Sequence, residues 1–274
     1  MTRRILPGFG LSLGCTLGAL GALVVLPLVA LLWTAAELGP SGWWAQIGTR
    51  RVLAALQLSF GAALLAALID TALGLLVAWV LVRYRFALRR VCDALVDLPF
   101  ALPTAVAGIA LTALYAPNGW LGSRLEPLGI TVAYTRLGVL LAMVFVGLPF
   151  VVRTLQPVLE SLEGELEEAA QTLGASPWQS FRHVLLPLLL PTLLTGFALA
   201  LSRAVGEYGS VVFIAGNRLF RTEIAPYLIV QKIDSQYDYH GAAALGAVML
   251  AISLVLLLAV AGLQRWSRRW AVVR

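Results

Sequence analysis

Six long apolar segments limit the folds that this chain can adopt. They span about 11–35, 53–82, 98–116, 137–156, 191–214 and 242–264. A helix that crosses a bilayer needs roughly 20 apolar residues, because each residue advances it by about 1.5 Å. Lipid offers no partner for backbone polar groups, so spanning segments form helices that bond internally. The sequence therefore predicts an all-α integral membrane protein with six transmembrane helices.

The distribution of the basic residues predicts how the helices are oriented across the membrane. Of the 20 basic residues, only Lys232 is a lysine. With the N-terminus inside, twelve basic residues lie on the inner side and seven on the outer side, and Arg203 lies within the membrane. Basic residues are enriched in the cytoplasmic loops of membrane proteins. We therefore expect both termini in the cytoplasm, and we read the net charge of +6 as topology, with membrane lipid and no nucleic acid as partner.

The sequence lacks the common motifs of catalysis. It contains no glycine-rich phosphate loop, no H-E-x-x-H, no G-x-S-x-G and no C-x-x-C pair. The histidines His183 and His240 fall on opposite sides of the predicted membrane, and Cys15 and Cys92 have no metal or redox spacing. The loops are too short to hold a catalytic domain. We expect a non-catalytic protein with no metal and no cofactor in this chain.

A charged stretch, Glu160–Pro191, separates two of the apolar segments and holds five of the 14 acidic residues. Its apolar residues recur every three or four positions, which predicts one stripe on a helix of about four turns; they are Leu159, Leu162, Leu166, Ala169 or Ala170, and Leu173. Gly174 then follows as a C-terminal cap would.

A second helix is predicted directly after Gly174. Ser176, Pro177 and Gln179 have the spacing of a capping box with proline at the first helical position. Pro187 and Pro191 are expected to separate this helix from the next membrane helix. The result is a corner of two short helices on the cytoplasmic face. A simple surface loop on lipid is disfavoured, because the inner leaflet is itself negative and would repel five glutamates. We therefore expect the corner to dock on a cytoplasmic partner.

The corner resembles the EAA signature, E-A-A-x3-G-x9-I-x-L-P, of bacterial ABC-importer permeases, with Val184 in place of the usual isoleucine. The resemblance implies a MetI-like type I permease fold over about 55–263, in which the corner is the coupling helix that fits a groove on a separate ATPase. The residues implied to couple to that ATPase are Glu168, Ala169, Ala170, Gly174, Ser176, Pro177, Leu186 and Pro187. We accordingly divide the chain into an N-terminal helix and outer loop (1–52), a permease domain (53–264) and a basic cytoplasmic tail (265–274).

Further segments resemble the CysT-type sulfate/thiosulfate permease family: 83–86, 97–108, 149–160 and 202–217. The resemblance implies a bacterial inner (plasma) membrane location. The implied partners are a CysA-like ATP-binding subunit, a CysW-like second permease subunit and a periplasmic or extracellular sulfate/thiosulfate-binding protein. Molybdate permeases share part of these motifs, and a homodimeric pore stays open. An ion-coupled secondary transporter is the alternative of a different class, for which only Asp70 and Glu207 offer intramembrane carboxylates.

Arg203 and Glu207 lie four residues apart on one face of the predicted fifth helix. An unpaired arginine at that depth costs at least about 2.5 kcal/mol. Two readings remain open: the pair neutralises itself, or it borders the translocation path. Pro99 and Pro103 predict a distorted start to the third helix, which could be a structural kink or could also border that path. For Asp70 we expect a buried, hydrogen-bonded or helix-pairing role rather than substrate binding.

Overall fold

The computed structural model describes residues 9–162 and 165–272, and within these ranges all regular structure is helical. Five helices are long and apolar enough to cross a membrane: Phe9–Ala36, Arg50–Arg83, Arg136–Ser161, Pro177–Val205 and Tyr239–Arg265. The remaining predicted span yields only a shorter apolar helix, Thr104–Tyr115. The all-α membrane architecture is thus confirmed, whereas six full-length spanning helices are not found among the described residues.

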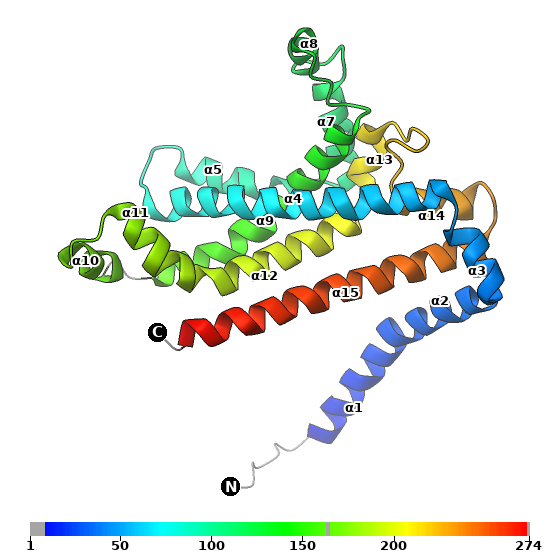
Figure 1. The fold of residues 1–274 in the computed structure, drawn as a ribbon, viewed down its shortest axis with the longest axis horizontal. Coiled ribbons are helices and arrows are strands. Elements are labelled where there is room, and N and C mark those ends of the chain that lie inside the picture. The colour runs from blue at the N-terminus through cyan, green and yellow to red at the C-terminus, as the bar shows by residue number, and fades with distance from the viewer. Residues whose placement is uncertain (1–8, 163–164, 273–274) are drawn as a thin grey trace.

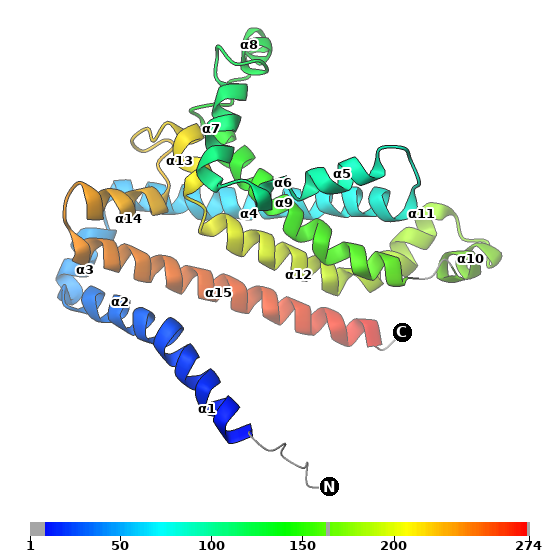
Figure 2. The same cartoon turned by 180° about the vertical axis from the view of Figure 1, so that it is seen from behind.

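Three helices form the centre of the bundle: α4 (Arg50–Arg83), α9 (Arg136–Ser161) and α12 (Leu186–Val205). They pack against one another, as seen from behind in Figure 2. Gly74 of α4 and Gly196 of α12 both face Val151 of α9, and a Cβ at Gly74 would lie 2.6 Å from the Val151 Cγ1 atom. Small residues let helix backbones approach closely, which favours packing in lipid. Helix α15 (Tyr239–Val272) lies along α12 and completes the bundle.

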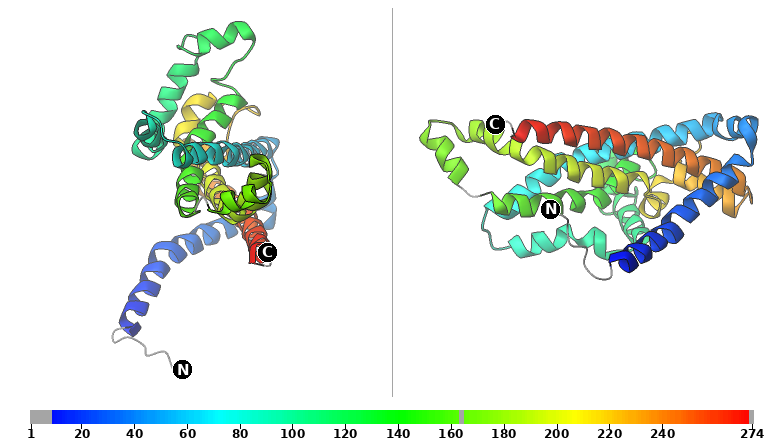
Figure 3. Two further views of the ribbon diagram at one scale, coloured as in Figure 1. Left: turned by 90° about the vertical axis from the view of Figure 1, so that its left-hand side faces the viewer. Right: turned by 90° about the horizontal axis from the view of Figure 1, so that it is seen from below.

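The first membrane segment is continuous but only half of it joins the bundle. Helices α1 (Phe9–Leu20) and α2 (Leu26–Ala36) are connected by a π-helical turn, Gly21–Val25. Helix α2 packs on α15 through alanines: Ala35, Ala243, Ala244 and Ala247. Helix α1 has no buried residue and diverges from the bundle (Figures 1 and 3).

The third predicted segment breaks at its prolines. It comprises α6 (Leu98–Ala101) and α7 (Thr104–Tyr115), with extended backbone at Leu102 and Pro103 between them. A residue before proline is pushed out of the α region, which explains the break. The predicted distortion is therefore confirmed. Before it lies α5 (Arg89–Val96), and after it α7 stands across the bundle and leads to α8 (Gly122–Leu125) and the 3₁₀ turn Glu126–Leu128 (Figure 1).

The bounds predicted for the fifth helix, 191–214, are wrong at both ends. Helix α12 already starts at Leu186, because α11 (Pro177–Ser180) and the π-helical turn Phe181–Leu185 run directly into it. Pro187 lies in the first turn of α12 and Pro191 lies inside it, so neither proline separates the corner from the membrane helix; a π-helical turn precedes Pro187 instead. At the other end, helix α12 ends at Val205 and helical structure resumes with α13 (Gly209–Ala215).

The predicted four-turn helix of the charged stretch is also wrong. Helix α9 extends to Ser161 and keeps Leu159, and α10 (Glu165–Thr172) contains only about two turns. Glu163 lies outside the described residues. At the opposite end of the molecule lie α3 (Gly39–Ile47) and α14 (Ala225–Asp234). The amphipathic helix expected between Asn217 and His240 is confirmed by α14, which buries Leu228.

Candidate coupling corner and translocation path

The turn between α10 and α11 has the predicted cap geometry. Gly174 adopts the left-handed conformation with φ of +84°, which glycine tolerates without a Cβ clash. Its N–H donates to the Gln171 carbonyl at 2.9 Å, and the Ala175 N–H donates to the Ala170 carbonyl at 3.0 Å. These bonds satisfy carbonyl groups at the end of α10.

The capping box that starts α11 is also confirmed. The Gln179 N–H donates to Ser176 Oγ at 3.3 Å, and the Ser176 N–H donates to Gln179 Oε1 at 2.8 Å. Pro177 occupies the first helical turn, where its missing N–H has no intrahelical partner to lose. The chain direction between α10 and α11 is therefore fixed on both sides by local hydrogen bonds.

The corner presents apolar side chains to its surroundings. Leu173 is 89% exposed and Trp178 is 66% exposed, and Leu166 is exposed as well. The predicted apolar stripe is therefore only partly packed, since Ala170 is buried while Leu166 and Leu173 are not. This exposed surface lies at the end of the bundle, beyond α4 and α9 (Figure 1).

An ion pair and a set of aromatic rings attach the corner to α4. Glu167 of α10 pairs with Arg83 at 2.8 Å, and the Arg83 guanidinium lies over the Trp79 ring at 5.5 Å. Phe181 meets Trp79 edge to face at 5.5 Å and stacks on Trp178 at 5.7 Å. The position of the corner therefore depends on the last turns of α4, a long-range contact that periodicity does not reveal.

The predicted coupling residues fall into two groups. Glu168 and Ala169 are exposed on α10 and Ala170 is buried there, Gly174 and Ser176 lie in the turn, and Pro177 begins α11. Leu186 and Pro187 instead lie half-buried in the first turn of α12. The structure thus places the first group at the corner and the second where the chain enters the bundle.

Arg203 and Glu207 form an ion pair, with 2.5 Å between Arg203 Nη1 and Glu207 Oε2. The Glu207 side chain is 2% exposed and that of Arg203 is 31% exposed. Glu207 lies beyond the end of α12, and its other oxygen accepts hydrogen bonds from the Ser210 N–H and Oγ–H, both at 2.8 Å. A carboxylate just before the start of α13, where it accepts from a first-turn N–H, is favoured by the helix dipole. Every oxygen of this buried carboxylate therefore has a partner.

Helices α7 and α13 cross in tight contact beside this ion pair. A Cβ on Gly108 would lie 2.8 Å from the Ser210 Cα atom, and Gly209 faces the side chain of Thr104. Pro103 precedes Thr104, so the crossing brings the proline break of α7 close to Glu207. Pro99 lies on α6, which contacts α9 instead. Of the four predicted path residues, three therefore gather at one place and Pro99 does not.

Asp70 of α4 is completely buried where α4, α9 and α12 meet. Its Oδ2 atom lies against Gly147, so closely that a Cβ there would overlap it, and Ala200 adjoins the same spot. Burial agrees with our expectation. No described residue donates a hydrogen bond to either carboxyl oxygen, so the expected partner is not found in the part of the chain that the structure covers.

A second charged cluster joins α9 to α5 and α6. Arg153 donates to Asp97 at 2.6 and 2.7 Å and to Asp93 at 2.6 Å, and it also bonds Gln156. The hydrogen bond from Gln156 lowers the pKa of Asp93, burial opposes the shift, and Arg153 and Arg89 add to the lowering. Sequence reasoning treated 83–97 as a loop and missed this cluster. The i, i+4 spacing of Asp93 and Asp97 was the available signal, since it puts both on one helical face.

Together these features define a class: a multi-pass helical membrane protein whose broken helices meet around a buried charged pair, as in transporters. The chain belongs to the family described as "Binding-protein-dependent transport system inner membrane component", which it matches over residues 70–272. Members of this class are membrane transport components rather than enzymes.

Curated relatives match almost the whole chain. A protein of Synechocystis named "Sulfate transport system permease protein CysT" is 52% identical over 249 residues, which cover 91% of this chain and 87% of that protein. A protein of Escherichia coli with the same name is 48% identical over 269 residues, covering 98% and 97%.

Solved structures agree on the fold. A chain of a bacterial alginate ABC transporter in complex with an alginate-bound periplasmic protein superimposes with a TM-score of 0.76 at 17% identity, covering 91% of both chains. A chain of the MetNI methionine ABC transporter superimposes with a TM-score of 0.57 at 18% identity, covering 80% of this chain and 95% of that one. The expected MetI-like ABC permease fold is therefore confirmed.

Proposed function

We propose that the chain is the permease subunit of an ATP-driven importer that moves sulfate and thiosulfate across the bacterial inner membrane. The observation that carries the proposal is the identity of about half of all residues to sulfate transport permeases, over about nine-tenths of the chain. The chain itself supplies the path, and ATP is hydrolysed on a separate subunit. In this proposal the permease domain is 53–264, preceded by an N-terminal helix and outer loop (1–52) and followed by a basic cytoplasmic tail (265–274).

The partners follow from this role. An ATP-binding subunit of the CysA type would dock at the corner, a second permease subunit of the CysW type would complete the pore, and an external binding protein would deliver the anion. The family description itself refers to binding-protein-dependent transport, which supports the last of these.

The corner is the proposed contact with the ATPase. Its exposed Leu173 and Trp178 offer the apolar anchor that interfaces favour. The hydrogen bonds around Gly174 and Ser176 fix the angle between α10 and α11, and the Arg83–Glu167 ion pair transmits a push on α10 to α4. A rigid corner attached to a spanning helix can pass on motion from an ATPase.

The orientation rests on the arginine distribution. The corner shares its end of the bundle with Arg83, Arg85, Arg89 and Arg90, so the positive-inside rule favours a cytoplasmic corner and cytoplasmic termini.

Arg203 is the proposed contact of the path with the anion. Its side chain is only part-buried although it pairs with Glu207, so the guanidinium can offer a transient field to a passing dianion. The crossing of α7 and α13 next to it, with Pro103 at the break, supplies irregular backbone of the kind that lines transporter cavities. Pro99 would contribute from α6 through its neighbour α9.

Two measurements test the proposal. The chain is co-purified with candidate ATPase subunits, as wild type and with Glu168 and Gly174 replaced; the replacements should release the ATPase, and retention would contradict the coupling role. Uptake of labelled sulfate, thiosulfate and molybdate then identifies the anion. Preferential uptake of molybdate would show that molybdate, not sulfate, is the substrate. Uptake driven by a proton or sodium gradient without ATP would indicate a secondary transporter.

A further inference from the structure

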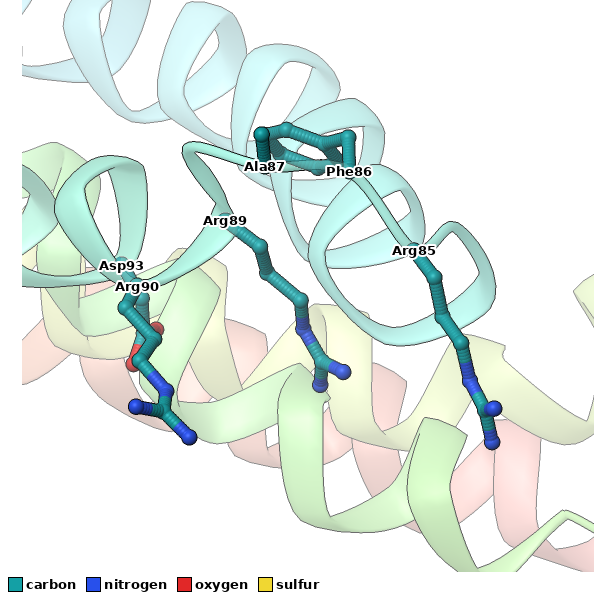
Figure 4. Close-up of a pocket in the computed structure, with 6 residues that line it drawn as sticks. All are labelled: Arg85, Phe86, Ala87, Arg89, Arg90 and Asp93. Carbon is teal, nitrogen blue, oxygen red and sulfur yellow. The ribbon is translucent and has the colours of Figure 1, made fainter.

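A cavity of about 540 Å³ opens between the end of α4 and α5. Three arginines line it, Arg85 and Arg90 being exposed and Arg89 half-buried, together with Phe86, Ala87 and Asp93. Figure 4 shows the three guanidinium groups extending to the same side of the 85–93 segment. Three like charges held in one hollow repel one another unless an anion lies between them.

The carboxylate in this cavity is already engaged elsewhere. Asp93 accepts hydrogen bonds from Arg153 at 2.6 Å and from Gln156 at 3.0 Å, and Asp97 accepts from Arg153 as well. Among the described side chains, no salt bridge joins Arg85, Arg89 or Arg90 to a carboxylate. Glu160 lines a neighbouring cavity of about 240 Å³ next to Arg89, and Glu167 pairs with Arg83. Among the described residues, Arg85, Arg89 and Arg90 therefore have no carboxylate within ion-pair distance, although the charge of Arg89 acts on nearby Asp93.

Planar guanidinium groups bind tetrahedral oxyanions through pairs of parallel hydrogen bonds. We propose that the cavity lined by Arg85, Arg89 and Arg90 is a binding site for a tetrahedral oxyanion of the sulfate or phosphate type. Two sources can supply this group. One is a free oxyanion, held for a moment at this end of the path. The other is the headgroup of an anionic phospholipid, for which Val91 and Leu95 of α5 offer exposed apolar contacts beside the arginines.

The test compares the full-length chain with the variant R85Q/R89Q/R90Q. A matched control, R50Q/R124Q/R182Q, removes three exposed arginines elsewhere and changes the net charge equally. Binding of labelled sulfate is measured by equilibrium dialysis in nanodiscs of zwitterionic phosphatidylcholine. Retention of phosphatidylglycerol against phosphatidylcholine is measured by native mass spectrometry. Both measurements report binding and not transport, so their outcome does not depend on whether the proposed transport function is correct.

We expect the cavity variant to bind one of the two probes about tenfold more weakly than wild type, while the control keeps wild-type affinity. Loss of sulfate binding assigns a free oxyanion, and loss of phosphatidylglycerol retention assigns a lipid headgroup. An unchanged melting temperature shows that the variant is folded. If the cavity variant binds both probes as wild type does, or if the control loses as much, the proposal is wrong.

Discussion

Replacing Arg203 by methionine tests whether the intramembrane pair is structural, functional or both. The change keeps most of the apolar stem and removes the charge, so that Glu207, 2% exposed, loses its cation. At an effective dielectric constant of about 20 and roughly 4 Å between charge centres, the attraction is about 4 kcal/mol. Because the Arg203 side chain is 31% exposed, water screens part of this, and we expect a loss of about 2–3 kcal/mol in stability.

The Glu207→Gln change should cost less, about 1 kcal/mol, because the amide oxygen can still accept from Ser210 and because Arg203 can turn toward solvent. The double variant should lose less stability than the sum of the two single losses, by a coupling energy of about 1–2 kcal/mol. Free energies of unfolding in mixed micelles, and uptake by the assembled transporter, are measured for all four proteins. If Arg203 also acts on the anion, the double variant shows this coupling in stability but no recovery of uptake. Additive losses would refute the pairing argument, and full uptake by the double variant would refute a role in the path.

Three further outcomes are expected. Gly108→Ala should destabilise the chain by about 1–3 kcal/mol, because its Cβ would press on the Ser210 backbone; unchanged thermal stability would refute the tight crossing. Gly174→Ala should weaken ATPase association in pull-down assays, because a left-handed residue with a Cβ costs about 1–2 kcal/mol, whereas Gly61→Ala on α4, where an added Cβ meets nothing within 4 Å, should not. The lowered pKa of Asp93 means that its contribution to stability is present above the unfolded-state pKa, about 3.9, and is lost as pH falls through the lower folded-state pKa; Asp93→Asn should remove this acid-dependent part of the melting curve.

The sequence was sufficient to predict those features of the fold that depend on residues close together in the chain. Apolar length identified the five spanning helices of the described residues, and the Gly174 cap and the Ser176 capping box were readable because both depend on residues three or four apart. The proline break before α7 was predictable for the same reason.

What sequence could not supply was contact between distant segments. The Arg153 cluster spans about 60 residues, and the pairing of Arg83 with Glu167 spans more. The length of α10 was misjudged because Leu159 fits the same periodicity as Leu166, although Leu159 belongs to α9 and Leu166 to α10. The end of α12 was misjudged because the apolar run continues through Val205 into α13, and only the Gly206–Tyr208 break separates them.

The central claim is that this chain imports sulfate with energy from an ATPase seated on the α10–α11 corner. The most direct test is uptake of labelled sulfate into proteoliposomes that contain the chain with its ATPase, second permease subunit and binding protein. We predict that uptake requires ATP, is competed by thiosulfate and falls sharply when Gly174 is replaced. Sulfate uptake that proceeds without ATP, or that continues unchanged with the altered corner, would contradict the account.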